Sequence, residues 1–543
     1  MNNGYFEIKF PENEPVKGYM PGSPERIALR AELERQLANP VEIPMIIAGK
    51  EIRSEHKEKI TCPHDHQKVL GEYCVAGENE LLMAIEAAEA ARTEWENMPW
   101  EHRATIFLKA ADLLTGKYRA KISAACMLGQ SKNPYQAEID VVCELADFLR
   151  FNPYYAQEIY KQQPISTNGV WNRVEYRALD GFVAAITPFN FTSIGGNLCT
   201  APAMVGNTVL WKPSSTAVLS NYYFMEILME AGLPAGVINF VPCRGADFGK
   251  VVVSHPKMAG FHFTGSTDVF NGIWNQVGQN IDKYVTYPRL VGETGGKDFI
   301  FAHESADVSA LACAITLGAF EYQGQKCSAV SRVYVPESIW GELRARLEKE
   351  IGSIKMGDVQ DFTNLMNAVI DRKSFKNLQK HLDFVKQSPD AEIIIGGKCD
   401  DSVGYFVEPT VILAKTPTFK TMVVEIFGPA VTIYVYPNDK LDETLNLCDT
   451  STIYALTGAV YAQDRAAIIK IANALDHAAG NFYINDKPTG AVVGQQPFGG
   501  SRASGTNDKA GSAVNLLRWM SQRTIKETYV PRTEVNYPYM IED

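Results

Sequence analysis

The apolar positions between residues 81 and 114 recur every three or four residues along the chain. This spacing is shared by Leu81, Ile85, Ala88, Ala91 and Trp95, and then by Ile106, Ala110, Leu113 and Leu114. Apolar side chains at this interval form one face of a helix, so the pattern predicts two or more amphipathic helices. The segment before residue 81 is polar and contains prolines, so these helices are predicted to come first.

Short runs of consecutive apolar residues replace this pattern from about residue 180. They occupy Gly181 to Thr187, Asn207 to Trp211, Val237 to Val241 and Met258 to Phe263, and segments of helical length such as Thr216 to Gly232 separate them. Strands that helices cover on both faces are apolar at consecutive positions. The alternation therefore predicts an α/β fold with a doubly wound parallel sheet.

A second α/β unit is predicted to begin near Glu293. Its helix-like stretches are Ala306 to Tyr322 and Ile339 to Ile351, and its strand-like stretches are Ala391 to Ile395 and Ala430 to Tyr436. No repeat or low-complexity linker separates the two units.

The composition narrows the possible partners. A chain of 543 residues, 46% of them hydrophobic, exceeds what one core organises, so we expect two or three domains. The 63 acidic residues outnumber the 52 basic ones, and the net charge of −11 argues against nucleic acid or an anionic membrane as a partner. The ten cysteines are scattered, so no disulfide is predicted. The longest apolar runs, such as residues 310–320, are shorter than the about 20 residues that span a membrane. A small-molecule partner is predicted.

The first forty residues bear on the cellular location. They include the acidic residues Glu12, Glu14, Glu25, Glu32 and Glu34 and only a few basic ones. A mitochondrial presequence is rich in arginine and poor in acidic residues. We therefore predict a cytoplasmic protein.

Cys327 is the candidate nucleophile. Small neighbours in Gly324-Gln325-Lys326-Cys327-Ser328-Ala329 allow a substrate to approach, and the cationic Lys326 favours the thiolate. Glu293, in Glu293-Thr294-Gly295-Gly296-Lys297, is the candidate base. Asn190 follows a predicted central strand, where its amide is placed to donate to an oxyanion, with the Cys327 N–H as second donor. Taken alone, Cys327 also suits a small buried apolar group and Asn190 a turn.

Two predicted strand ends carry groups suited to a nucleotide. Trp211-Lys212-Pro213-Ser214-Ser215 brings an ammonium group and hydroxyls to the place where a ribose or phosphate lies in a doubly wound sheet. Phe263-Thr264-Gly265-Ser266-Thr267 ends another strand and opens a helix, so Gly265 and Ser266 are placed to face a pyrophosphate. The sequence has no G-x-G-x-x-G, so such a site would differ from the usual Rossmann fingerprint.

Two Gly/Pro turns, Glu425-Ile426-Phe427-Gly428-Pro429 and Pro497-Phe498-Gly499-Gly500-Ser501, complete a series of seven ordered motifs. Together with the Pro-Phe-Asn, Lys-Pro-Ser, Phe-Thr-Gly-Ser, Glu-x-Gly-Gly-Lys and Gly-Gln-x-Cys segments, they resemble the NAD(P)-dependent aldehyde dehydrogenase superfamily over about residues 45 to 525. The resemblance implies that Cys327 is the nucleophile, Asn190 the oxyanion donor and Glu293 the base that activates water.

The resemblance also implies the architecture of that superfamily. It comprises a Rossmann-like NAD-binding domain, an α/β catalytic domain and a small β oligomerisation element. We assign residues 1–150 and 173–291 to the first, 292–480 to the second, and 151–172 with 510–543 to the third. The tail after residue 528 is too apolar for a solvated terminus, so we expect it to dock on another subunit of a homodimer or higher homo-oligomer.

NAD is the implied cofactor. The residues expected to bind it are Thr187, Pro188, Phe189, Lys212, Ser214, Ser215, Gly265, Ser266, Thr267, Glu293, Glu425 and Phe427. Lys212 is expected at the adenosine ribose and Glu425 at the nicotinamide ribose. Ser215 replaces an acidic residue that often grips the ribose hydroxyls in NAD-preferring members, so NADP stays open as an alternative.

Three features resemble the branch of the superfamily that oxidises L-glutamate γ-semialdehyde to L-glutamate, the second step of proline degradation. They are Thr187–Thr192, Phe270 and the stretch Gln495–Lys509. The resemblance places the substrate against Ser328, Gly490, Ala491, Phe191, Phe498, Glu144 and Lys326. Backbone N–H groups of a glycine-containing loop suit the α-carboxylate. Some members carry serine where Ala491 stands, and alanine lacks the hydroxyl of that serine. We therefore expect Gly490 to contribute more than Ala491 to recognition of the substrate.

Other functions remain open from the sequence. An aldehyde dehydrogenase for another semialdehyde would share every motif. A thiol hydrolase would share the nucleophile, base and oxyanion donor without needing the nucleotide-binding residues. A binding protein on this scaffold would be expected to lose the nucleophile or the base, and both are present. Cys62, His64 and His66 offer possible metal ligands, but no second cluster completes a four-ligand site, so no metal is predicted.

Overall fold

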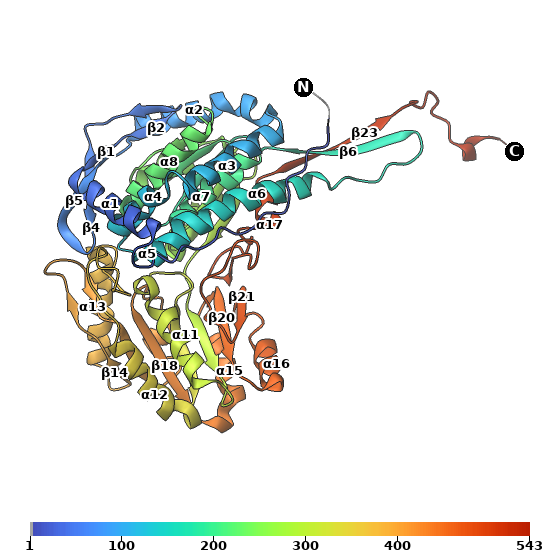
Figure 1. Cartoon of the computed structure of the whole chain (residues 1–543). Coiled ribbons are helices and arrows are strands. Elements are labelled where there is room, and N and C mark those ends of the chain that lie inside the picture. Colours follow the sequence, from blue (N-terminus) through green and yellow to red (C-terminus); the bar gives the residue numbers. More distant parts are fainter. Residues whose placement is uncertain (1–3, 543) are drawn as a thin grey trace.

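Two seven-stranded sheets organise the computed structural model, which describes residues 4–542 (Figure 1). The first has the order β11-β10-β7-β8-β9-β2-β3. Its strands are β2 (Met45–Ile47), β3 (Lys50–Ile52), β7 (Phe182–Ile186), β8 (Val209–Lys212), β9 (Ile238–Phe240), β10 (Met258–Thr264) and β11 (Arg289–Glu293). The run from β11 to β9 is parallel, and β2 pairs antiparallel with β9 and β3. The four strands predicted between residues 181 and 263 are confirmed.

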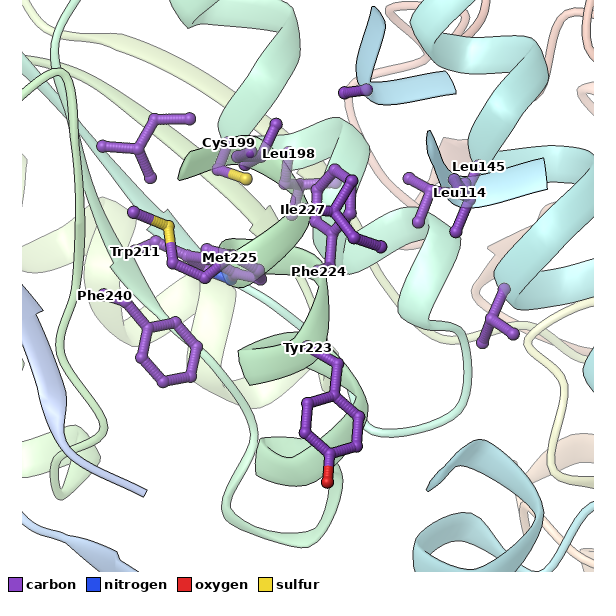
Figure 2. Packing of buried hydrophobic residues seen from close by; sticks show 14 of the residues in the cluster. Leu114, Leu145, Leu198, Cys199, Trp211, Tyr223, Phe224, Met225, Ile227 and Phe240 are labelled. Carbon is purple, nitrogen blue, oxygen red and sulfur yellow. The ribbon is translucent and has the colours of Figure 1, made fainter. Parts of the chain in front are cut away.

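Helices cover both faces of the first sheet. One face carries α3 (Trp100–Thr115), α4 (Arg119–Gln130), α6 (Leu145–Tyr160), α7 (Thr192–Met204) and α8 (Val218–Ala231), and the other carries α2 (Glu78–Asn97) and α10 (Thr267–Gln279). Val183 and Trp211 join the core on the first face, whereas Ala184 and Leu210 join the core on the second. Figure 2 shows Trp211 beside α8, where its ring lies 6.1 Å from that of Phe224. Both faces of the sheet are therefore buried, which explains why its strands are unbroken apolar runs in the sequence.

The second sheet has the order β14-β17-β18-β13-β12-β20-β21. Its strands are β12 (Asp298–Ala302), β13 (Val330–Pro336), β14 (Ala391–Ile395), β17 (Thr410–Ala414), β18 (Ala430–Tyr436), β20 (Thr457–Tyr461) and β21 (Asn481–Ile484). Only β14 runs antiparallel to its neighbour. Helices α11 (Val308–Phe320) and α12 (Glu337–Gly352) cover one face, and α13 (Arg372–Lys386), α15 (Leu441–Thr450) and α16 (Arg465–Ala474) cover the other. The predicted second α/β unit is confirmed.

The N-terminal region is more regular than its polar composition indicates. It contains α1 (Pro24–Ala38), β1 (Val41–Ile43), β4 (Lys57–Cys62) and β5 (Asp65–Cys74), besides β2 and β3. The prediction that the amphipathic helices after residue 81 come first is therefore wrong. Three of the strands are only three residues long, too short to show an apolar run or an alternation.

An antiparallel ribbon of β6 (Val170–Arg177) and β23 (Ser521–Thr528) projects from the body, and the C-terminal tail continues from its end (Figure 1). Residues 151–160, which are predicted to belong to the oligomerisation element, form the second half of α6, which packs against α3 and α7. Within residues 4–542, no helix combines the length and the apolar character needed to cross a membrane.

Candidate active site

Cys327 lies where two cavities meet. One has a volume of ≈ 1060 Å³ and the other of ≈ 390 Å³, and Cys327 lines both. The preceding turn bends sharply at Gly324, which has a φ of +63° and would bring a Cβ within 2.4 Å of the Gly428 carbonyl oxygen. The Gln325 side chain anchors the turn by accepting a hydrogen bond from Ile370 N at 2.9 Å. The sequence thus folds this segment so that the sulfur faces both cavities.

The surroundings of Cys327 disfavour its thiolate form. Burial raises its pKa well above the usual range, and the negative charges of Glu293, Asp298 and Glu425 raise it further. Its own backbone N–H acts in the opposite direction. The expectation that Lys326 stabilises the thiolate is wrong, because the Lys326 ammonium pairs with Glu321 at 3.0 Å instead. The thiol must therefore lose its proton during the reaction.

Asn190 lies beyond the carboxyl end of β7, buried and facing the larger cavity with Cys327. Its Nδ2 donates one hydrogen bond to the carbonyl oxygen of Gln325 at 3.1 Å. A primary amide has two N–H donors. One donor therefore fixes Asn190 to the cysteine loop, and the other is available to an oxyanion that forms on a carbon bonded to the sulfur.

Glu293 ends β11 and lines the smaller cavity together with Cys327. Burial raises the pKa of its carboxyl to about 8, while Lys509 acts to lower it and Asp508 to raise it. A carboxylate with a pKa near neutrality is suited to act as a general base. The structure places Glu293 on the smaller cavity, so its predicted second role as a cofactor contact lacks support from the cavity lining.

The larger cavity opens at the carboxyl ends of β7, β8 and β10. Of the predicted cofactor residues, those that line it are Thr187, Pro188, Phe189, Lys212, Ser214, Ser215, Gly265, Ser266, Glu425 and Phe427. Thr267 does not line it, because its hydroxyl donates to Ala503 O at 3.1 Å instead. Glu425 is held by a 2.8 Å hydrogen bond from Gly296 N, and the Phe427 ring meets Phe189 edge-on at 5.8 Å.

The donors of the larger cavity suit a dinucleotide. Its position at the carboxyl edge of a parallel sheet is where doubly wound folds bind such ligands. Gly265 and Ser266 precede the first residue of α10, and backbone N–H groups at a helix N-terminus favour a pyrophosphate. A Cβ at Gly265 would lie 2.6 Å from the Phe263 ring, so the close turn requires glycine. The residues present therefore match NAD in size, charge and donor placement.

The smaller cavity contains every predicted substrate residue. These are Glu144, Phe191, Lys326, Ser328, Gly490, Ala491 and Phe498. Ser328 Oγ lies 2.8 Å from the Thr489 hydroxyl, and Gly490 has a φ of +97°. Burial, with the nearby Asp140 charge, raises the pKa of Glu144 to about 8. The wall of the cavity thus combines the aromatic rings of Phe191 and Phe498 with the hydroxyls of Ser328 and Thr489 and the backbone of Gly490 and Ala491.

Sequence reasoning missed several residues of the smaller cavity. Thr489, Lys487 and Glu321 all line it, as does Asn13 from the N-terminal segment. Thr489 directly precedes Gly490 and Lys487 lies three positions before it, so their closeness to a predicted contact was a usable signal. No sequence pattern connects Asn13 with residues more than 450 positions away.

The metal-ligand candidates near residue 64 do not converge. His64 Nδ1 lies 3.2 Å from the Ser131 hydroxyl, whereas His66 Nε2 lies 3.0 Å from the Asp401 carbonyl oxygen. Cys62 is buried in β4. Among the residues that the structure describes, no group of three or more His, Cys, Asp or Glu side chains is arranged to hold a metal ion.

The chain belongs to the aldehyde dehydrogenase family, whose model, described as "Aldehyde dehydrogenase family", matches residues 51–525. "Delta-1-pyrroline-5-carboxylate dehydrogenase, mitochondrial" from Dictyostelium discoideum is 54% identical over 538 residues, 98% of this chain and 96% of the relative. The relative of the same name from Homo sapiens is 51% identical over 529 residues, 97% of this chain and 94% of the relative. The crystal structure of Delta-pyrroline-5-carboxylate dehydrogenase from Mycobacterium tuberculosis bound with NAD is 50% identical, has a TM-score of 0.96 and covers 100% of both chains. The predicted aldehyde dehydrogenase fold is confirmed.

These relatives overturn the predicted cytoplasmic location. Both eukaryotic relatives are named mitochondrial, which points to a mitochondrial rather than a cytoplasmic protein. The prediction was wrong because it interpreted the acidic residues of the first forty positions as bearing on targeting. Residues 24–38 form α1, which buries Leu29 and Leu33 in the protein core. The acidic residues of this helix therefore belong to a folded element and give no information about a presequence.

Proposed function

We propose that this enzyme oxidises L-glutamate γ-semialdehyde, the open form of Δ1-pyrroline-5-carboxylate, to L-glutamate with NAD, as the second step of proline degradation. The observation that carries the proposal is the position of Cys327 between a cavity suited to a dinucleotide and a second one with a polar end suited to a carboxylate. The names of the relatives, and the NAD bound to the Mycobacterium tuberculosis protein, support this assignment.

The first chemical step forms a bond between Cys327 and the aldehyde carbon. An aldehyde does not readily lose hydride from a trigonal carbon, and addition of the sulfur makes that carbon tetrahedral. The thiol is partly exposed, so its proton passes to solvent water as the C–S bond forms, and this step does not depend on Glu293. The new oxyanion accepts hydrogen bonds from the free N–H of Asn190 and the backbone N–H of Cys327. NAD, when bound, accepts the hydride that this carbon loses.

The second step hydrolyses the thioester left on Cys327. A water molecule attacks the carbonyl carbon, the C–S bond breaks, and a carboxylic acid is released. Attack by water needs a general base within hydrogen-bond reach. Glu293 lines the same cavity as the thioester carbon would, and below its pKa of about 8 it is mainly protonated. Deacylation is therefore expected to accelerate as the pH rises through that value.

We place the α-carboxylate of the substrate at the part of the smaller cavity that Ser328, Thr489, Gly490 and Ala491 line. The hydroxyls of Ser328 and Thr489 lie together there, next to the backbone of Gly490 and Ala491. Phe191 and Phe498 line the same cavity and offer apolar surface to the aliphatic chain. Because Ala491 has no hydroxyl, its contribution is limited to its backbone N–H.

The alternatives differ in how they use the cavities. An enzyme for another semialdehyde with a carboxylate would use the same groups, so it remains the second candidate. A thiol hydrolase would have no use for the ≈ 1060 Å³ cavity that Cys327 also lines, so the structure does not favour it.

We also propose a homo-oligomer, a dimer or higher, assembled through the β6–β23 ribbon and the tail. An isolated two-stranded ribbon is marginal in water. This ribbon and tail expose Trp171 to 49% and Val530 to 84%, which supports burial against another subunit. The division into NAD-binding residues 1–150 and 173–291, catalytic residues 292–480 and oligomerisation residues 151–172 and 510–543 stays a prediction.

The proposed function is tested by NADH absorbance with the purified enzyme. Glutamate semialdehyde, succinate semialdehyde and propanal are offered at matched concentrations with NAD, and with NADP in parallel. We expect the highest kcat/KM for glutamate semialdehyde with NAD. Equal or faster turnover of either competitor would refute the substrate assignment, and a preference for NADP would refute the cofactor assignment.

A further inference from the structure

The N-terminal strap, which we define as residues 8–20, lies outside the segment matched by the family model, which begins at residue 51. It has no helix or strand, and it runs along α6 (Figure 1). Yet Asn13, Glu14 and Val16 line the ≈ 390 Å³ cavity together with Cys327. A segment beyond the family model thus forms part of the wall of the substrate cavity.

The Asn13 side chain joins the strap to two other parts of this wall. Its Nδ2 donates to Asp147 Oδ2 of α6 at 2.8 Å and to the Val493 carbonyl oxygen at 2.8 Å. Its Oδ1 accepts from Gln495 Nε2 at 2.9 Å. Both donors and the acceptor of the amide are therefore used, a combination that an alkyl or a carboxylate side chain cannot reproduce.

The strap is firmly attached on the side of α6. Glu14 N donates to the second carboxylate oxygen of Asp147 at 2.8 Å, and the Glu14 carboxylate pairs with Arg119 at 3.0 Å and Arg150 at 2.8 Å. The Tyr19 hydroxyl donates to Glu138 at 2.7 Å. The backbone around Asn13 is thus fixed relative to α6.

The loop on the other side of Asn13 packs Val493 against Phe148 and Phe151 of α6 but has fewer polar attachments than the strap. It runs from Gly490 to Gln496 within a stretch that has no helix or strand, between the end of β21 and the start of β22 (Ser501–Arg502). Within 4 Å of the place where a Cβ of Gly490 would lie, the single neighbouring group is Lys487 Nζ, at 3.8 Å. Gly490 is therefore open to a ligand, and its position depends on how the rest of the loop is held.

We propose that Asn13 is a positioning residue that holds the loop 490–496 against α6, so that the N–H groups of Gly490 and Ala491 stay aligned with the substrate carboxylate. The inference rests on the proposed function, because it assigns that carboxylate to this loop. Binding groups act only when held close to the productive geometry. Loss of the Asn13 amide removes the hydrogen bonds to Val493 and Gln495, two and four residues after Ala491, and leaves the packing of Val493 against Phe148 and Phe151 as the attachment of this loop to α6.

The test compares Asn13→Ala with wild type on two substrates. For glutamate semialdehyde we expect KM to rise about tenfold with kcat nearly unchanged, because loop position governs binding of the carboxylate. For propanal, which has no carboxylate, kcat/KM stays within about twofold of wild type. The matched control is Lys9→Ala, an exposed residue of the same strap outside the cavity lining, which leaves both substrates unaffected. The melting temperature is recorded for both variants.

Two outcomes would overturn the inference. An unchanged KM for glutamate semialdehyde would show that the loop needs no attachment to Asn13. Parallel losses on both aldehydes, with a lowered melting temperature, would show that Asn13 is merely structural. If wild type prefers succinate semialdehyde, the proposed substrate is wrong, and the same comparison with that carboxylate-bearing aldehyde decides the role of Asn13. If wild type uses only alkyl aldehydes, both proposals fail.

Discussion

The two cavities that meet at Cys327 are built in different ways. The larger one is formed at the ends of neighbouring strands of one sheet, with Lys212 ending β8 and Gly265 following β10, and is completed by the turn at Glu425. The smaller one is assembled from segments that are distant in the sequence, from Asn13 of the strap to Phe498 near the C-terminus. Strand ends and the helices that follow them form most of the first, whereas the second combines the ends of β10 and β11 with loops and helices from distant parts of the chain.

This difference distinguishes the cofactor cavity, which the family shares, from the substrate cavity, which determines specificity. A cavity at strand ends inherits its geometry from the backbone hydrogen bonds of the sheet, so single side chains contribute charge more than shape. A cavity made of loops depends on individual side chains, such as Asn13, to hold each wall. Substitutions in the smaller cavity should therefore change specificity while cofactor affinity is preserved.

Replacement of Cys327 by alanine has the largest expected effect, because this side chain serves both cavities. Loss of a catalytic nucleophile costs roughly 10³-fold or more in kcat. The steady-state NADH assay measures the loss, and titration calorimetry with NAD should show a dissociation constant within about twofold of wild type, since alanine leaves the strand-end cavity intact. A large loss of NAD affinity would contradict the separation of the two cavities.

Glu293→Gln should leave the first half of the reaction and block the second. Losing a general base costs roughly 10²–10⁴-fold, so steady-state turnover falls while a stopped-flow trace retains a burst of NADH near one equivalent per site. In wild type the Glu293 carboxylate must be deprotonated to accept a proton. Its pKa of about 8 lies above the usual value, so steady-state turnover rises as the pH increases through about 8.

The Glu293 variant should lose that rise with pH, which provides the control within the same experiment. A variant without a burst would contradict the role of Glu293 in deacylation alone and would indicate that it is needed already when the thiol loses its proton. A wild-type profile that is flat from pH 6 to 9 would assign the base to another group.

The sheets could be predicted from the sequence because their strands are covered on both faces. The side chains from Phe182 to Ile186 point alternately into two buried cores, so every position of this strand is apolar. A strand with one face in solvent would alternate apolar and polar residues instead. The strands β1 to β3 could not be predicted, because strands of three residues are too short to show a periodicity. Their position is set by pairing with distant strands, such as Ile46 with Phe240.

The candidate site shows the same limit. Cys327, Asn190 and Glu293 lie in short motifs, and the structure brings all three beside the two cavities. The pairing of Lys326 with Glu321 could not be predicted, since it depends on the left-handed backbone of Tyr322 and Gln323, which folds the chain back on itself. Thr267 was predicted to bind the cofactor because it follows Gly265 and Ser266, but its hydroxyl donates a hydrogen bond to Ala503 O. Sequence motifs therefore locate the functional segments, but the hydrogen-bond and ion-pair partners of each side chain become known only from the structure.

Thr489→Val gives the smallest expected effect and the sharpest test of the difference between the cavities. Valine keeps the size of threonine, so the wall stays filled while Ser328 Oγ loses the hydroxyl that lies 2.8 Å from it. A hydrogen bond of this kind contributes about 0.5–1.5 kcal/mol, so KM for glutamate semialdehyde should rise roughly 2- to 12-fold. The affinity for NAD should not change. Thr489→Ser, which restores a hydroxyl, should recover most of the wild-type KM, and a serine variant no better than valine would mean that the methyl group of Thr489 matters more than its hydrogen bond.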